Sequence, residues 1–454
     1  MKKIILISAF LFSFSFSQSL LGVRYPTGVS YPATTTSARI GSTGAGLKEP
    51  YLVNSLNPAN VGAIKQSVYT LSVNADYQRI IGENDKYSDF YSFSPSFIGF
   101  AFPIGKAGTL GASFGQNGAN NYSYSAESYL PETTFVTETP SETYNRIEQT
   151  QRFDNSISHS SWEFGWGMEL FRRISVGASY QMSQYKNRMV RSDVLKNSPY
   201  SALDSIYSGL DSIYYNQAGS AVSFGLLGNF SKLGVGFAMT IPFDVYIKSK
   251  RTISVLQQNS DGSYSDFPMH DNSIFNDPKK YKMKLPPSWI AGFSWEFSDK
   301  LKTMLDFNVT MWEKYKTDAP FLGYETEVLP PPEDGEQPNN AGDLANLDKL
   351  SNALRISAGT QFIPQPNLLS SKFYQKMRYS GGLSYKQLPI DGDWEMSFSV
   401  GLGLPLGNRG IVDFSLETGL RRSENYDEYK ENFVRVNFGM SGGQVWKKSS
   451  NNIY

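Results

Sequence analysis

Residues 162–170 read Trp-Glu-Phe-Gly-Trp-Gly-Met-Glu-Leu, so that every second residue is large and apolar. The residues between them are glutamate or glycine. Successive side chains of a β-strand point to opposite faces, which places the apolar residues on one side and Glu163 and Glu169 on the other. An apolar face against lipid and a polar face toward a water-filled lumen produce this pattern. The stretch therefore predicts one strand of a transmembrane β-barrel.

The same alternation recurs to the end of the chain, as in 301–312 and 432–446. We predict an all-β, antiparallel transmembrane barrel of about fourteen strands, an even number as in single-chain bacterial barrels. The predicted strands are 67–79, 91–102, 109–116, 157–170, 174–187, 218–230, 233–246, 285–297, 301–312, 352–363, 377–387, 394–404, 410–421 and 432–446. A β-sandwich or propeller is the alternative, but neither requires the abundant aromatic residues of this chain.

The gaps between the predicted strands alternate in length. Short gaps follow the even strands, at 103–107, 171–173, 231–232, 298–300 and 405–409. Long gaps follow odd strands, at 117–156, 188–217, 247–284 and 313–351. Outer-membrane barrels have short periplasmic turns and long extracellular loops, so both chain ends are expected in the periplasm. The stretch 364–376 departs from this order, and is either a structured periplasmic loop or a sign of a misplaced strand.

The N-terminal residues differ from the rest. Residues 1–17 form a charged start, an apolar run too short to span a bilayer as a helix, and small residues before Gln18, which predicts a secretory signal peptide. Residues 18–66 are rich in Gly, Pro, Thr and Ser and show no alternation. Unpaired backbone is excluded from lipid, so 18–66 is predicted to be a plug, or hatch, inside the lumen of a barrel formed by 67–454. The predicted location is the outer membrane, with its lipid as surroundings.

The composition argues against most chemical functions. The chain contains no cysteine and two histidines, and its formal net charge is zero. Disulfides, thiolate metal sites and a cysteine nucleophile are excluded, and a neutral chain does not favour nucleic acid. His159 lies among serines on a strand, where neighbouring side chains point to opposite faces and cannot form a catalytic triad by themselves. We expect no enzyme activity, no cofactor and no metal.

Several short motifs occur in a fixed order. Gly44-Ala45-Gly46 and then Asn57-Pro58-Ala59 precede the first strand, and Leu285-Pro286-Pro287 leads into a hairpin with Gly292, Asp306 and Trp312. Residues 401–407 form a late Gly-rich strand and turn, and a final stretch runs from Gly439 to Trp446-Lys447-Lys448. This order resembles the FadL family of outer-membrane transporters of long-chain fatty acids and other hydrophobic compounds, in its Bacteroidetes-type branch.

The resemblance implies two candidate sites. The first is the hatch motif, formed by Gly44, Gly46, Asn57, Pro58 and Ala59. The second is a lateral gate at a kinked third strand, which would correspond to Gly108, Gly111, Gly115 and Gly118. Glycine permits a kink or bulge in a strand, although barrel strands also carry glycine for close packing.

Charged residues of both signs fall on the predicted lumen faces, among them Glu163, Glu169, Glu296, Lys302, Asp306, Arg355, Asp413, Glu417, Arg421 and Arg435. Salt bridges that hold the plug are one interpretation. A cationic partner for a fatty-acid carboxylate is the other, with Arg355 or Arg435 as candidates.

The sequence thus predicts passive uptake of a hydrophobic small molecule, with hatch movement and lateral release. Two alternatives remain open. PorV-like barrels also resemble the sequence, and in them the barrel binds a secreted protein instead of moving lipid; a secreted or periplasmic protein would then be the partner. A general porin is the third possibility, but an open water-filled pore does not require a plug.

Overall fold

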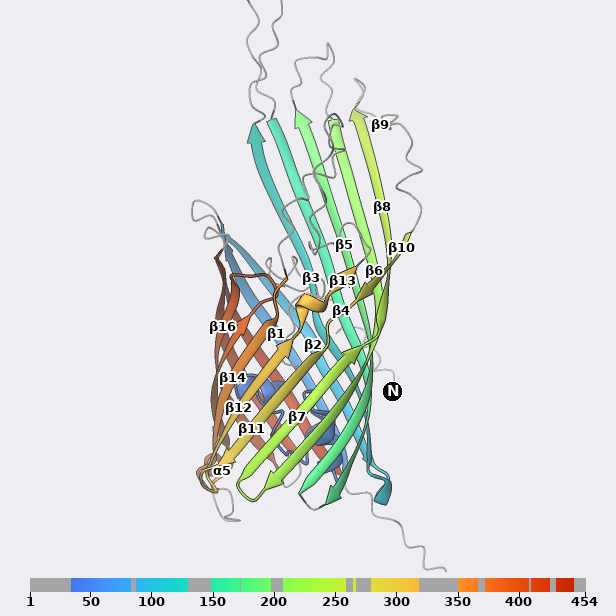
Figure 1. The fold of residues 1–454 in the computed structure, drawn as a ribbon. Coiled ribbons are helices and arrows are strands. Elements are labelled where there is room, and N and C mark those ends of the chain that lie inside the picture. The colour runs from blue at the N-terminus through green and yellow to red at the C-terminus, as the bar shows by residue number, and fades with distance from the viewer. Residues whose placement is uncertain are drawn as a thin grey trace, which may run out of the picture.

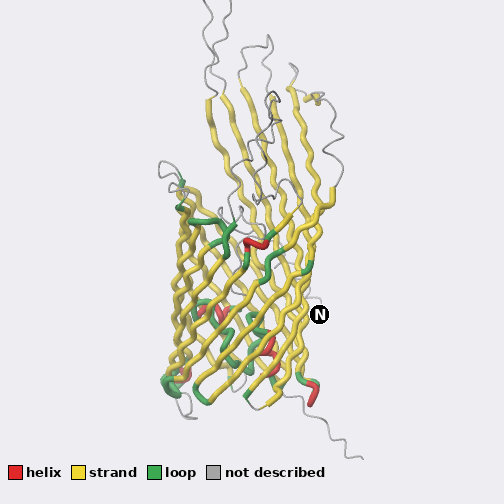
Figure 2. Tube along the Cα trace, viewed as in Figure 1, coloured by secondary structure: helices red, strands yellow, loops and turns green. Residues whose placement is uncertain are grey.

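The computed structural model describes residues 34–82, 87–129, 148–171, 173–196, 207–258, 264–266, 279–317, 350–365, 372–407, 410–424 and 430–444. The strands of this part pair antiparallel with their neighbours along the chain. The first strand, β1 (Ser67–Ile81), also pairs with the last, β18 (Lys430–Gln444), which closes the sheet into a barrel (Figures 1 and 2). The predicted signal peptide, 1–17, and residues 18–33 of the predicted plug lie outside the described residues.

The barrel wall has fourteen strands, as the sequence predicts. Three of them are each described as two segments, because the ladder is interrupted between β7 and β8, between β10 and β11, and between β12 and β13. The remaining elements are β2 (Tyr87–Pro103), β3 (Thr109–Tyr129), β4 (Glu148–Phe171), β5 (Ile174–Lys196), β6 (Tyr207–Phe230), β7 (Leu233–Pro242), β8 (Asp244–Gln258), β10 (Lys279–Lys284), β11 (Ser288–Glu296), β12 (Leu301–Thr310), β13 (Lys316–Thr317), β14 (Ala353–Phe362), β15 (Arg378–Gln387), β16 (Asp393–Leu406) and β17 (Gly410–Ser423). A short strand, β9 (Tyr264–Asp266), pairs with the end of β8.

The two faces of the wall differ as the alternation predicts. On β18, Val436 and Phe438 are 49% and 40% exposed, whereas Arg435 and Asn437 are buried. The outward face is therefore apolar and the inward face polar, which a strand between lipid and lumen requires.

The short connections lie together at one end of the barrel (Figure 1). The β2–β3 turn contains a single 3-10 turn, η3 (Gly105–Ala107). The overlong stretch 364–376 contains a one-turn helix, α5 (Phe373–Lys376), at the same end of the barrel. β14 and β15 flank 364–376 where the sequence predicts strands, so no strand was misplaced; of the connection itself, 364–365 and 372–376 are described.

The strands β3 to β8 are longer than predicted. β4 and β6 have 24 residues each, against 10 in β14 and β15. Stretches 117–129, 148–156, 188–196, 207–217, 247–258, 264–266 and 279–284 are strand, so the prediction of loops over 117–156, 188–217 and 247–284 was wrong for these parts. About nine to eleven tilted residues cross a bilayer. The additional length therefore rises past the rest of the wall as a tall sheet, which we call the overhang (Figures 1 and 2).

Residues 34–66, which we call the plug, lie inside the barrel (Figure 2). A short helix, α3 (Thr35–Arg39), contacts β15 to β18, and a 3-10 helix, η1 (Pro58–Ala63), contacts another part of the inner wall, β3 to β6. No helix of the described residues is long and apolar enough to cross a membrane.

Candidate functional site

The plug backbone packs against wall glycines around the barrel. A Cβ added to Gly177 of β5 would stand 2.3 Å from the carbonyl oxygen of Pro58, and one added to Gly236 of β7 would stand 2.0 Å from that of Ala45. These glycines occur in register, as Gly167–Gly177–Gly225, Gly236–Gly292 and Gly359–Gly382. Only a residue without a side chain permits so close an approach, so the wall is shaped to receive the plug.

Asn57 joins the two halves of the plug. Its side-chain oxygen accepts a hydrogen bond from the Ala59 amide at 3.0 Å. Asn57 thereby caps the start of η1, which begins at Pro58. Its side-chain nitrogen donates to the carbonyl of Ala45 at 3.0 Å and to that of Leu226 in the wall at 3.1 Å. The Asn-Pro-Ala motif is therefore a helix cap that also fixes the plug to β6.

The glycines of the hatch motif lie opposite an aspartate. Gly44, with a φ of +140°, and Ala45 donate their amides to Oδ2 of Asp306 at 2.8 and 3.0 Å. Gly46 lies against Gly292, where an added Cβ on Gly46 would meet the Gly292 carbonyl oxygen at 2.5 Å. Asp306, which the sequence places in the lumen, thus binds the plug backbone.

Ion pairs complete the attachment. Nε of Arg39 lies 3.0 Å from Oδ1 of Asp413, and both side chains are buried. Burial lowers the pKa of the Arg39 guanidinium, and Asp413 opposes that shift. Glu49 pairs with Arg378 at 3.1 Å, and Glu169 accepts from both Lys48 and Lys65 in the plug. The prediction that inward charges hold the plug agrees with these contacts.

The wall is not paired along all of its height. β2 and β3 pair over seven residues, from Pro103–Thr109 to Phe97–Gly115. Beyond that point β2 continues along β1 to Tyr87, and β3 continues along β4 to Tyr129, without pairing with each other. We call this unpaired boundary the seam. Since a strand needs about nine to eleven residues to cross the bilayer, the seam begins within the apolar band.

The four predicted gate glycines occupy different positions. Gly108, with a φ of +105°, ends the turn after η3. Gly111 pairs with Ala101, and Gly115 forms the last pair below the seam. Gly118 lies within the register shift between Gln116 and Ala119 in the β3–β4 ladder. Gly115 and Gly118 are thus at the start of the seam, whereas Gly108 and Gly111 lie below it.

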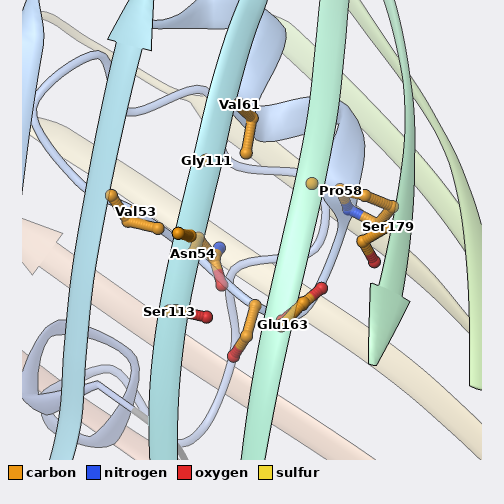
Figure 3. Close-up of a pocket in the computed structure, with 11 residues that line it drawn as sticks. Val53, Asn54, Pro58, Val61, Gly111, Ser113, Glu163 and Ser179 are labelled. Atoms are coloured by element: carbon orange, nitrogen blue, oxygen red, sulfur yellow. The ribbon is translucent and has the colours of Figure 1, made fainter. Parts of the chain in front are cut away.

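A pocket adjoins β3 just below the seam (Figure 3). Plug residues form one side and strands β3 to β5 the other; the lining residues are Val53, Asn54, Ser55, Pro58, Val61, Gly111, Ala112, Ser113, Glu163, Gly165 and Ser179. The Val53 amide donates to Thr70 of β1 at 3.0 Å, and the Val53 side chain packs in a cluster with Phe97. The pocket therefore lies between the plug and β3, the strand whose pairing with β2 ends at the seam.

The two predicted carboxylate partners differ in their surroundings. Arg435 lies 2.5 Å from Asp76 and 2.9 Å from Glu417, so two carboxylates neutralise it. The Arg355 side chain has no hydrogen bond or ion pair with a described residue, and its Nε is buried. Lys386 stands opposite Arg355 in the β14–β15 register and likewise has no ion pair with a described residue. Sequence reasoning missed Lys386, because the register across strands is needed to see this pair.

An apolar cluster lies next to Arg355 and Lys386 and includes Ala353 and Leu388. It joins β8, β10 and the 3-10 turn η4 (Trp312–Lys314) with the chain around an isolated bridge between Leu350 and Ile390. Its buried members are Val245, Ile247, Met283, Trp312, Tyr315, Leu350, Ala353, Leu388 and Ile390. Apolar side chains therefore pack against one another close to the charges of Arg355 and Lys386.

Comparison with protein-family models places the sequence. Residues 1–451 match the model described as BamG. The chain belongs to the BamG family. Comparison with curated proteins finds no match.

Solved structures share the fold of this BamG-family chain. A FadL homologue of Pseudomonas aeruginosa has 12% identity and a TM-score of 0.56, covering 91% of this chain and 98% of its own. The toluene transporter TbuX of Ralstonia pickettii has 13% identity and a TM-score of 0.52, covering 90% and 98%. The toluene transporter TodX of P. putida has 12% identity and a TM-score of 0.51, covering 92% and 99%. The resemblance to the FadL family is confirmed for the fold.

Two of these neighbours are described as toluene transporters. In the described residues of this chain no cluster of His, Asp or Glu could hold a metal ion. His159 of β4 lies opposite Tyr185 of β5, with ring centroids 6.3 Å apart.

Proposed function

We propose that this chain is an outer-membrane transporter for hydrophobic small molecules of the long-chain fatty-acid type, which enter the lumen from outside and leave sideways through the seam. The observation that carries the proposal is the end of β2–β3 pairing at Phe97 and Gly115, within the apolar band. Toluene transporters and a FadL homologue among the structural neighbours support it.

The plug supports a lateral exit over an axial one. It contacts β3 to β6 and β15 to β18 and is held by the buried ion pair of Arg39 and Asp413, so an axial path would require many contacts to break together. The hatch movement that transport needs is then local. We place it at Val53 to Ser55, which line the pocket below the seam, while the residues on either side remain against wall glycines.

The polar end of the cargo would meet Arg355. This guanidinium and the adjacent Lys386 are cations in the lumen without an ion pair to a described residue, and a carboxylate supplies the charge-assisted hydrogen bonds they lack. Arg435 is the weaker candidate because Asp76 and Glu417 already accept from it. The apolar cluster with Trp312 would contact the hydrocarbon part.

The proposed orientation follows from the connections. Short turns and the described ends of β1 and β18, paired through Ser67 and Gln444, lie at the plug end of the barrel, which we place in the periplasm. The overhang then projects outside the cell. A general porin is disfavoured by the filled lumen. A PorV-like accessory role is the second candidate, favoured by the overhang, which transport of a small molecule does not require.

The test is uptake by liposomes that contain the purified chain. Labelled long-chain fatty acid should enter them faster than protein-free liposomes, whereas a hydrophilic sugar of similar mass should not. Equal rates for the fatty acid with and without protein would contradict the proposal, and fast entry of both solutes would identify a porin.

A further inference from the structure

The overhang is a regular sheet with one covered and one open edge. Its strands β3, β4, β5, β6 and β8 are paired to their ends, at Tyr129–Glu148, Glu148–Lys196, Leu195–Tyr207 and Tyr207–Gln257. At the β8 edge, β10 pairs with the lower part and β9 with the end. At the β3 edge, no described strand pairs with β3 above Gly115.

Part of this open edge stands outside the lipid. Leu110, at the periplasmic end of β3, is 48% exposed and faces lipid. Counting about nine to eleven residues for the membrane crossing brings β3 to the outer surface near Asn121. The segment 121–129 then extends into the aqueous phase. It pairs with β4 on one side and with no described strand on the other.

The sequence of β3 does not protect this edge. Proteins usually protect an exposed edge strand with lysine, proline or a short length. Residues 119–129 contain no proline, lysine or arginine, and Glu127 is their one charged residue. The central strand β5, which needs no protection, carries Lys186, Arg188, Arg191, Asp193 and Lys196. The charge distribution is thus the reverse of what an edge strand in contact with water alone would favour.

We propose that residues 121–129 of β3 are a docking edge for an extended segment of another polypeptide, which adds as an antiparallel strand. The backbone N–H and C=O groups of a strand edge alternate along its length, and an extended peptide is the ligand that matches them. The antiparallel direction follows from β2, which pairs antiparallel with β3 below the seam. Above the seam β2 no longer pairs with β3, so a peptide strand can take the same place and direction beside β3. A second copy in the same membrane would run its own β3 in the same direction, and would therefore offer a parallel strand. This inference does not depend on fatty-acid transport.

The probe is a fluorescent peptide that copies residues 148–160, the sequence that pairs antiparallel with β3 on its other side. Fluorescence anisotropy with the full chain in lipid nanodiscs should show saturable binding. The same peptide with N-methyl groups on successive residues loses the hydrogen-bond donors of both its edges, and should bind at least tenfold more weakly. No binding, or equal binding of both peptides, would overturn the proposal.

Two variants locate the site. Ser123→Lys with Ser125→Lys charges the open edge and should weaken peptide binding at least tenfold. Ser208→Lys with Ser212→Lys introduces the same charge into β6, which is paired on both sides, and should leave binding unchanged. Equal binding by both variants would contradict docking on β3. Hydrogen exchange offers a check independent of folding yield: amides of 121–129 should gain protection with the peptide, and unchanged exchange would contradict the proposal.

Discussion

Arg39 of the plug and Asp413 of β17 form a buried ion pair, with Nε and Oδ1 3.0 Å apart. The Arg39 guanidinium also donates to Ser380 at 2.9 Å and to Gln361 at 2.8 Å, and Thr36 donates to Asp413. One arginine therefore joins the plug to β14, β15 and β17. Because a buried charge is costly without its partner, this contact ties the position of the plug to the stability of the barrel.

Removal of one partner should destabilise the barrel strongly. Asp413→Asn leaves the Arg39 charge buried and uncompensated, a change that typically costs about 3–5 kcal/mol. The expected result is a lower temperature for loss of the folded band in heat-modifiability electrophoresis. The double variant Arg39→Met with Asp413→Leu removes both charges and should recover part of the loss. An unchanged transition in Asp413→Asn would show that the pair does not hold the plug.

The wall glycines should not tolerate even one methyl group. A Cβ on Gly225 would stand 2.1 Å from Oδ1 of Asn57, so Gly225→Ala must displace the Asn-Pro-Ala motif. Overpacking of this kind costs about 1–3 kcal/mol. Gly381→Ala is the matched control, since its nearest atom would be 3.5 Å away. Limited proteolysis of the plug should accelerate in Gly225→Ala alone; similar digestion of both variants would contradict tight packing.

Substitutions of the two lumen arginines, Arg355 and Arg435, should have different effects on fatty-acid binding and on thermal stability. Arg355→Gln removes a cation without an ion pair to a described residue, and should weaken fatty-acid binding at least tenfold while the thermal transition is unchanged. Arg435→Gln leaves Asp76 and Glu417 without their partner and should lower the thermal transition instead. Calorimetric titration with a fatty acid and with the alcohol of equal chain length measures the difference. If Arg355→Gln weakens binding of both ligands equally, Arg355 does not bind the carboxylate.

The plug contact of Glu49 should resist acid. Burial raises the pKa of this carboxyl, but Arg378 and Lys302 outweigh burial, and the net pKa lies below its ordinary value of 4.5. A lowered folded-state pKa means that the contribution to stability is present above the ordinary pKa and is lost as pH falls through the folded-state value. Glu49→Gln should therefore lower the thermal transition at pH 7 and still at pH 4.5, with the difference vanishing at lower pH. A difference that has already vanished at pH 4.5 would contradict a lowered pKa.

Much of the wall could be predicted because lipid imposes a period of two on each strand. The alternation seen in 162–170 and 432–446 recurs along the chain, and it predicts the fourteen strands that the structure has. The overhang could not be predicted in this way, since strands above the lipid have no apolar outer face to maintain. Residues 188–196, with four charges, therefore resemble a loop in sequence although they form the end of β5.

The candidate site was less accessible to sequence reasoning. Arg355 and Arg435 look alike on their predicted strands, and only the neighbouring strands show that Arg435 is paired. Lys386 becomes relevant only through the β14–β15 register. Register depends on contacts between segments far apart in the chain, which one sequence does not specify. Of the glycines predicted to form a gate, Gly115 lies where the β2–β3 pairing ends, whereas Gly108 lies in the turn before β3; whether they form a gate stays a prediction.

The seam can be closed chemically because the chain contains no cysteine. Ser96→Cys with Gln116→Cys places two thiols beside the last β2–β3 pair, and Ser357→Cys with Ser384→Cys joins strands whose hydroxyls are already 3.0 Å apart. Fatty-acid uptake by liposomes should fall at least tenfold when the first pair is oxidised and return on reduction, while the second pair should have no effect. Full uptake with the seam disulfide formed would contradict lateral release.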